Sequence, residues 1–173
     1  RFSVKNKSLL AKLQQDNQWV HHAENVLLMG PSGTGKTHIA SALLHTLVEQ
    51  GIRCRLFPAV ALVQHLQQAK RDLELMAAMT KLDKYRAIVI DDIGYVKKTD
   101  AETQVLFEFI AHRYESGSLI ITANQPFSQW DSIFPDSMMT VAAVDRLIHH
   151  ASIMELEGGS YRIEQQRQLE SKP

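Results

Sequence analysis

The sequence predicts an α/β fold in which helices cover both faces of a parallel sheet. From Asn25 onward, short apolar runs alternate with stretches of helical periodicity, the order expected of a buried parallel sheet. A glycine-rich loop at residues 30–37 follows the first apolar run, and the acids Asp91 and Asp92 follow a wholly apolar one. Both polar segments thus lie at strand ends, where open parallel sheets bind their ligands.

Composition limits the class of protein. The 173 residues suffice for one globular domain, and 19 Lys and Arg balance 19 Asp and Glu, so overall charge does not favour nucleic acid or an anionic membrane. The single cysteine, Cys54, excludes an internal disulfide and suits a reducing compartment. No apolar run reaches the roughly 18 residues that span a bilayer. We expect a cytoplasmic protein with no membrane partner and, because it begins at Arg1, a piece of a longer chain.

The elements follow in order. Residues 1–24 predict one amphipathic helix that flanks the core. Strands are expected at residues 25–29, 52–57, 86–90 and 118–123. In the second of these, Arg53 and Arg55 alternate with apolar residues, which predicts a position near the sheet edge, whereas 87–90 is apolar throughout and predicts a central strand.

Helices fill the intervals. The stretch after the glycine loop repeats Ile39, Leu43 and Leu47 on one face. Two short helices are expected within residues 59–81, one over 100–114 and one over 138–150. Beyond them, Gly158 and Gly159 predict a hairpin between two strands, and residues 166–173 predict a disordered tail.

The glycine loop matches the phosphate-binding pattern G-x-x-x-x-G-K-[ST] in its required setting, after a strand and before a helix. Glycines let backbone amides turn toward phosphate oxygens, and the helix N-terminus adds positive potential. The predicted nucleotide contacts are Gly30, Pro31, Ser32, Gly33, Thr34, Gly35, Lys36, Thr37 and His38. Within this set, Lys36 would reach the β and γ phosphates, and the Thr37 hydroxyl would bind Mg²⁺.

Phosphate chemistry also needs an acid for the metal at a neighbouring strand end. Asp91 is the expected Mg²⁺ acid, acting through water, and Asp92 is placed to orient or deprotonate an attacking water. Asn124, at the end of the next strand, either holds that water or opens a turn. In the last helix, Val141, Val144 and Ile148 form an apolar stripe.

Stepping about 100° per residue places Arg146 nearly opposite this stripe. It is therefore either a solvated surface residue or an arginine finger for a neighbouring subunit.

Five segments together resemble one family: VLLMGPSGTGKTHIASAL, AIVIDDIGY, SLIITANQPFSQW, AAVDRLIHHA and GGSYR. They look like the IstB helper ATPases of insertion sequences and, more distantly, the DnaC-type helicase loaders, both of them AAA+ proteins. The similarity runs from about Arg1 to Arg162. It implies a five-stranded AAA+ core over residues 25–165 with little or no helical lid, and an upstream partner-binding segment.

By position, the resemblance makes residues 30–37 the Walker A loop and the two acids the Walker B pair. It makes Asn124 the sensor, Arg146 the finger and Arg162 a second sensor on the γ-phosphate. The implied activity is ATP hydrolysis with ATP-dependent self-assembly on duplex DNA, to deliver a transposase. Asp92 stands where many AAA+ proteins have Glu, which implies slow hydrolysis, although the IstB pattern tolerates Asp.

Two alternatives stay open. A loader of a replicative helicase keeps the fold and changes the client, and a small-molecule kinase would use the same loop but usually closes an Arg-rich lid, which the sequence lacks. The DNA-contact candidates are Lys70, Arg71, Lys97 and Lys98. Neither His21-His22 nor His149-His150 is expected to ligate one ion, because helical neighbours diverge by about 100°; the only metal expected is Mg²⁺.

Overall fold

The computed structural model describes residues 3–96, 99–134 and 136–158. Its five strands form one parallel sheet in the order β2-β3-β4-β1-β5. The strands are β1 (Asn25–Met29), β2 (Cys54–Pro58), β3 (Ala87–Asp91), β4 (Ser118–Ala123) and β5 (Ala151–Glu155). The predicted α/β class and five-stranded parallel sheet are confirmed.

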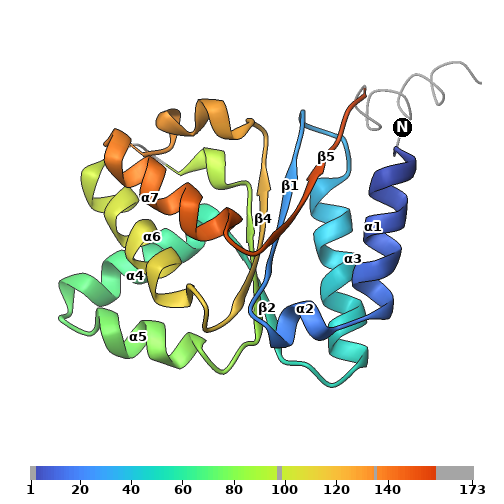
Figure 1. Cartoon of the computed structure of the whole chain (residues 1–173). Helices are drawn as coiled ribbons and strands as arrows, with labels where there is room; N and C mark the ends of the chain where they lie inside the picture. Colours follow the sequence, from blue (N-terminus) through green and yellow to red (C-terminus); the bar gives the residue numbers. More distant parts are fainter. Residues whose placement is uncertain (1–2, 97–98, 135, 159–173) are drawn as a thin grey trace, which may run out of the picture.

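Helices cover both faces of the sheet, with α1 to α3 on one side and α4 to α7 on the other (Figure 1). The helices are α1 (Val4–Gln15), α2 (Gln18–His21), α3 (Lys36–Glu49), α4 (Ala59–Arg71), α5 (Leu75–Leu82), α6 (Asp100–Arg113) and α7 (Ser137–Ile148). Two short 3₁₀ helices, η1 (Ile93–Tyr95) and η2 (Phe127–Ser132), follow β3 and β4. Within the described residues, no helix is long and apolar enough to cross a membrane.

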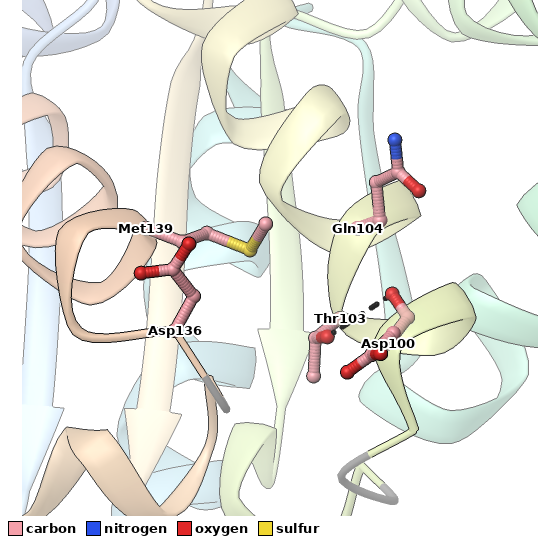
Figure 2. A pocket seen from close by; sticks show the side chains of 5 residues that line it. All are labelled: Asp100, Thr103, Gln104, Asp136 and Met139. Carbon is pink, nitrogen blue, oxygen red and sulfur yellow. Dashed lines mark hydrogen bonds between the residues drawn. The ribbon is translucent and has the colours of Figure 1, made fainter.

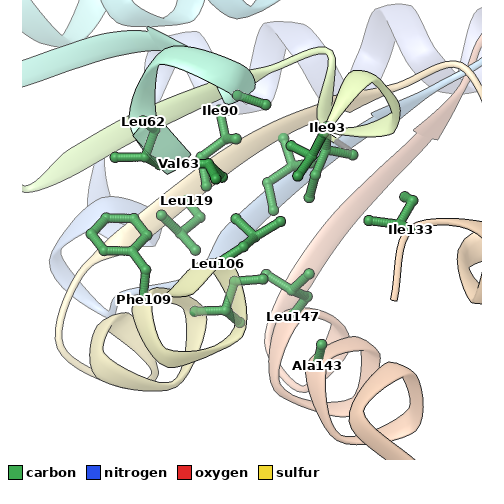
Figure 3. Close-up of a cluster of buried hydrophobic side chains, with 14 of the residues drawn as sticks. Leu62, Val63, Ile90, Ile93, Leu106, Phe109, Leu119, Ile133, Ala143 and Leu147 are labelled. Carbon is green, nitrogen blue, oxygen red and sulfur yellow. The ribbon is translucent and has the colours of Figure 1, made fainter. Parts of the chain in front are cut away.

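Alternation along the strands builds two cores. Leu27, Ile88 and Ile121 face α4 to α7 and join the larger cluster, part of which Figure 3 shows, whereas Val26 and Val89 face α3. Since both faces are buried, β1, β3 and β4 are apolar over most of their length. The sheet is thus a rigid support for the residues that follow its strands.

The strand with alternating arginines lies where it was predicted. β2 is at the edge of the sheet, with Arg53 and Arg55 exposed, and β3 is interior. Cys54 is half-buried, and this burial raises the pKa of its thiol. The predicted helices over 59–81 and 100–114 are also present.

The N-terminal flank differs from the prediction of a single helix. The helix breaks at Asp16, whose backbone is extended and whose Oδ1 accepts a 2.9 Å bond from the amide of Gln18. This bond is an Asx-turn, which competes with helical hydrogen bonds, and α2 begins after Asn17. Trp19 and Val20 on α2 are nevertheless buried against the core.

The predicted apolar stripe of α7 is wrong at Val141 and Ile148, whereas Val144 is partly buried against the larger core. The buried residues are Thr140, Ala143 and Leu147, while Val141 is 60% and Ile148 40% exposed. Small side chains at positions 140 and 143 let the helix approach its neighbours closely, so size decided the buried face where hydrophobicity alone did not.

The end of the chain is described only in part. The first strand of the predicted hairpin is β5, which pairs in parallel with β1. The second strand and the predicted tail at 166–173 lie outside the described residues.

Candidate nucleotide-binding site

The glycine loop has the backbone that a phosphate cradle needs. Gly30, Gly33 and Gly35 have φ values of 147°, 80° and 89°, a region that side-chain-bearing residues rarely adopt. A Cβ on Gly30 would also overlap the carbonyl group of Leu156. Gly35 is the N-cap of α3, so the loop leads directly into a helix whose first amides are available to an anion.

Lys36 is buried within the loop that it belongs to. It is 5% exposed, and its Nζ donates 2.8 Å bonds to the carbonyl oxygens of Gly30 and Pro31. Burial lowers the pKa of Lys36, and the charges of Asp92 and Asp91 partly oppose that effect. The ammonium group therefore lies against the loop backbone, and the negative charges of both acids stabilise its protonated form.

Thr37 and Asp91 come together as a metal-binding pair requires. Thr37 Oγ1 lies 3.0 Å and 3.1 Å from the two carboxylate oxygens of Asp91, across 54 positions of sequence. Thr37 is in the first turn of α3, and Asp91 ends β3. A hydroxyl and a carboxylate in contact are the oxygen donors that Mg²⁺ takes from proteins beside nucleotide phosphates.

Asp92 and Asn124 lie at the same edge of the sheet. Asp92 has φ 58° and ψ 56° and begins the turn into η1, a left-handed conformation that Asp adopts more readily than most residues. Asn124 is half-buried and directly follows β4. The preceding carbonyl, of Ala123, accepts a 3.2 Å bond from the amide of Gly30, so the β4 end contacts the glycine loop.

One residue of this edge was not singled out from the sequence. Thr122 is fully buried, and its Oγ1 lies 2.6 Å from Asp91 Oδ1 and accepts a 2.8 Å bond from the amide of Asp92. Its signal was a hydroxyl within the apolar run at residues 119–123, since a buried hydroxyl usually has a hydrogen-bond partner.

The remaining predicted loop contacts are more open. Pro31, Ser32 and His38 are exposed, Gly33 and Thr34 are half-buried, and Thr34 Oγ1 donates a 2.8 Å bond to Pro31 O. The glycine backbone, the lysine and the Thr37–Asp91 pair thus fit a nucleoside triphosphate with Mg²⁺. Arg162, the predicted second sensor, lies outside the described residues.

Arg146 lies roughly a quarter turn from the buried face of α7 and not opposite it. It is half-buried, its Nη1 donates a 2.8 Å bond to Ala142 O, and its guanidinium lies 5.4 Å from the centroid of the Phe107 ring. The outward direction predicted from the stripe is therefore only partly correct, because the stripe itself was partly wrong.

The DNA-contact candidates are not equivalent. Lys70 forms a 2.9 Å ion pair with Glu108, which offsets its charge, whereas Arg71 is exposed and bonds to Gln68. Lys97 and Lys98 lie outside the described residues.

A separate hollow opens between the N-terminal ends of α6 and α7 (Figure 2). Its volume is about 290 Å³, and it is lined by Asp100, Thr103, Gln104, Asp136 and Met139. None of these is a predicted nucleotide contact, so the hollow is distinct from the glycine loop.

His149 and His150 can face one ion, contrary to the prediction from helical spacing. Helix α7 ends at Ile148, and ligand atoms of His149, His150 and Glu115 lie within 4.8 Å of one another. Two imidazoles and a carboxylate can ligate zinc, but all three side chains are exposed, so holding them in one geometry costs side-chain entropy.

Comparisons with known proteins agree with this geometry. The chain matches the family described as IstB-like ATP binding protein over residues 3–169. It is 48% identical over 91% of its length to an insertion sequence ATP-binding protein of Sinorhizobium fredii (y4iQ/y4nD/y4sD), and 36% identical over 86% to the IS21 ATP-binding protein of Pseudomonas aeruginosa. It spans 53% and 56% of those two relatives.

Solved structures share the fold. The DnaC helicase loader superposes with a TM-score of 0.71 at 19% identity, covering 90% of this chain and 92% of that one. AMPPCP-bound DnaA from Aquifex aeolicus gives 0.69 at 15% identity, covering 98% and 52%. The glycine loop, its acids and the family match lead to one conclusion: this chain belongs to the IstB-like ATP-binding proteins of insertion sequences and shares the fold of the DnaC loader.

Proposed function

We propose that this chain binds ATP with Mg²⁺, hydrolyses it, and uses the nucleotide to assemble on duplex DNA and deliver a transposase. The observation that carries the nucleotide part is the contact between Thr37 and Asp91 at the mouth of the glycine loop. The relatives' printed names, which refer to insertion sequences and ATP binding, support the transposition part.

Each residue has a role in this proposal. Loop amides and Lys36 bind the phosphates, and Thr37 with Asp91 holds Mg²⁺, which would neutralise charge on the transferred phosphoryl group. Asp92 orients or deprotonates the attacking water and Asn124 holds it. Residues in unusual backbone conformations cluster at functional sites, and the left-handed φ of Asp92 is consistent with its role.

Arg146 is proposed to act on the nucleotide of a neighbouring subunit. Its contacts with Ala142 O and the Phe107 ring hold it against its own subunit, so it would leave them when subunits assemble. Arg162 is proposed as the second sensor.

Contact with DNA must come from local patches, because the chain as a whole carries no net charge. Of the described candidates, Arg71 is the stronger, since Lys70 is paired with Glu108. The affinity for DNA should therefore fall as salt rises, with a slope proportional to the number of phosphates contacted.

Two alternative functions differ from this proposal in the partner protein that is delivered or in the molecule that accepts the phosphoryl group. Loading of a replicative helicase would use the same site, but the likeness to the DnaC loader at 19% identity concerns the fold alone. A small-molecule kinase would require an acceptor site, whereas paired acids next to Asn124 suit water as the acceptor.

Sedimentation of the purified chain tests the proposal. The chain is compared with and without ATP and Mg²⁺, and with and without duplex DNA, at one moderate salt concentration. Large complexes that need both ATP and DNA are expected, and Lys36→Met should remain small under all conditions. A wild-type chain that binds ATP yet never assembles would contradict the assembly part, and one that binds no ATP would contradict the whole proposal.

A further inference from the structure

Thr122, in β4, contacts both acids. Its side chain is fully buried, 2.6 Å from Asp91 Oδ1 and 2.8 Å from the amide nitrogen of Asp92. A threonine hydroxyl has one proton and two lone pairs. Because the amide of Asp92 uses a lone pair, the proton is free to bond to the Asp91 carboxylate, and that bond is short, as is typical of a charged acceptor.

The Asp91 carboxylate is therefore held from two sides. Thr122 approaches it from β4, in the interior of the sheet, and Thr37 approaches from α3. The paired register of β3 with β4 ends at Ile90 and Ile121. The Thr122 hydroxyl thus continues the connection between the two strands for one more residue.

The same hydroxyl anchors the turn that aims Asp92. Asp92 leaves β3 in a left-handed conformation, φ 58° and ψ 56°, which costs free energy for a residue other than glycine. Its amide nitrogen binds the hydroxyl beyond the last paired residues of the two strands. Loss of the Thr122 hydroxyl would therefore free both the Asp91 carboxylate and the turn at Asp92.

Packing alone does not require threonine here. Valine fills nearly the same space and suits a buried strand equally well, while a buried hydroxyl is costly unless it is bonded. Leu119, Ile120 and Ile121, which precede it, are all apolar and buried. The hydroxyl at position 122 is thus accounted for by the acid pair and not by the core.

We propose that Thr122 is the positioning residue of this acid pair, orienting the Asp91 carboxylate toward the Mg²⁺ of the nucleotide and holding the turn that carries Asp92. The inference rests on the proposed function and names a residue that acts through the acids without touching the nucleotide. Replacing a residue that hydrogen-bonds to a metal ligand, and so orients it, typically lowers metal affinity or activity by about 10- to 100-fold.

The test compares Thr122→Val with Thr122→Ser, which restores the hydroxyl. Thr140→Val is the matched control, because Thr140 is also buried and, among the described residues, its hydroxyl bonds to Asp136 O at the start of its own helix and not to either acid. The readout is the Mg²⁺ concentration that gives half-maximal affinity for a fluorescent ATP analogue, which requires no hydrolysis. A second readout is hydrogen exchange of the Asp92 amide in the nucleotide-free protein.

For Thr122→Val, the Mg²⁺ concentration at half-maximal affinity is expected to rise at least about 10-fold. The Asp92 amide of this variant is expected to exchange its hydrogen faster than in the wild type. Thr122→Ser and Thr140→Val should stay near wild type in both readouts. A Thr122→Val variant with the wild-type Mg²⁺ requirement overturns the inference. If that variant does not fold, Thr122→Cys replaces it, because a thiol fills the space but donates only weakly, and the same criterion applies.

Failure of the inference and of the proposed function are separable. A wild-type chain that binds no ATP analogue at any Mg²⁺ concentration contradicts the proposed function. If the wild type and Thr122→Val both bind the ATP analogue and require the same Mg²⁺ concentration, only the role of Thr122 is contradicted.

Discussion

Gly30 lies directly against Leu156, the residue that follows β5. The amide of Leu156 donates a 2.7 Å bond to Met29 O, and a Cβ on Gly30 would overlap the Leu156 carbonyl. The first glycine of the phosphate loop is therefore constrained by a close backbone contact as well as by its own φ.

Gly30→Ala should consequently lower the free energy of unfolding by more than a glycine-to-alanine substitution at a position where only the positive φ is unfavourable. Backbone strain of this kind costs roughly 1–3 kcal/mol, and the clash adds to it, so we expect both lower stability and weaker ATP binding. Gly51→Ala is the control, because Gly51 has φ 78° but nothing within 4 Å of its would-be Cβ. Thermal unfolding compares the two; equal losses would show that the Leu156 contact yields without cost.

The buried lysine predicts a pH dependence of stability. Burial lowers the pKa of Lys36 from 10.5. Between its folded pKa and that value, the unfolded chain binds a proton that the folded chain has released, so the free energy of unfolding rises with pH through this window.

Lys36→Met removes the titrating group and should lack that rise. Denaturant unfolding from about pH 8 to pH 10.5 is the measurement, with the exposed Lys12→Met as the control. Parallel pH profiles for the wild type and Lys36→Met would contradict the effect of burial.

Arg146→Ala should spare ATP binding, reduce hydrolysis, and fail to complete the site of a wild-type neighbour. An arginine supplied to a neighbouring site is worth about 10³- to 10⁵-fold in rate where it has been measured. Steady-state ATPase rates of mixed wild-type and variant subunits test this, with Arg53→Ala, at an exposed arginine to which no role in the site is assigned, as the control for loss of charge. Normal hydrolysis by assembled Arg146→Ala would show that another group has the role.

Replacing Arg113, which lies away from the nucleotide site, should strongly lower the stability of the fold. It is 2% exposed, its Nη2 donates to the carbonyls of Tyr85 and Arg86, and its Nη1 lies 3.6 Å from Asp83. Arg113→Met removes the bond to the Tyr85 carbonyl and the pairing with Asp83, while the Arg86 carbonyl keeps its 2.9 Å bond from the Ser118 amide. The loss should lower the free energy of unfolding by on the order of 3 kcal/mol.

Urea unfolding is the measurement for this substitution, and Arg71→Met on the exposed end of α4 should change stability by less than about 0.5 kcal/mol. Similar losses in the two variants would mean that the buried guanidinium is not needed to pair the Tyr85 carbonyl and Asp83.

Much of the architecture follows from local pattern. The apolar runs with β-branched residues predicted β1 to β4, and the glycine pair at 158 and 159 predicted β5 as the first strand of a hairpin. The alternation in 52–57 predicted the edge position of β2, because one exposed face imposes a period of two. The glycine loop and the two acids were also readable, since phosphate binding demands particular residues at particular spacing.

Tertiary structure alone decided which side chains meet. The sequence by itself determined the fold class, the loop and the acids, whose chemistry depends on neighbours along the chain. It did not determine the buried face of α7, where the small residues Thr140 and Ala143 displaced Val141, because close packing depends on the opposing surface. Nor did it identify Thr122, whose bonds to Asp91 and Asp92 span 31 and 30 positions of sequence and exist only because parallel pairing sets β4 beside β3.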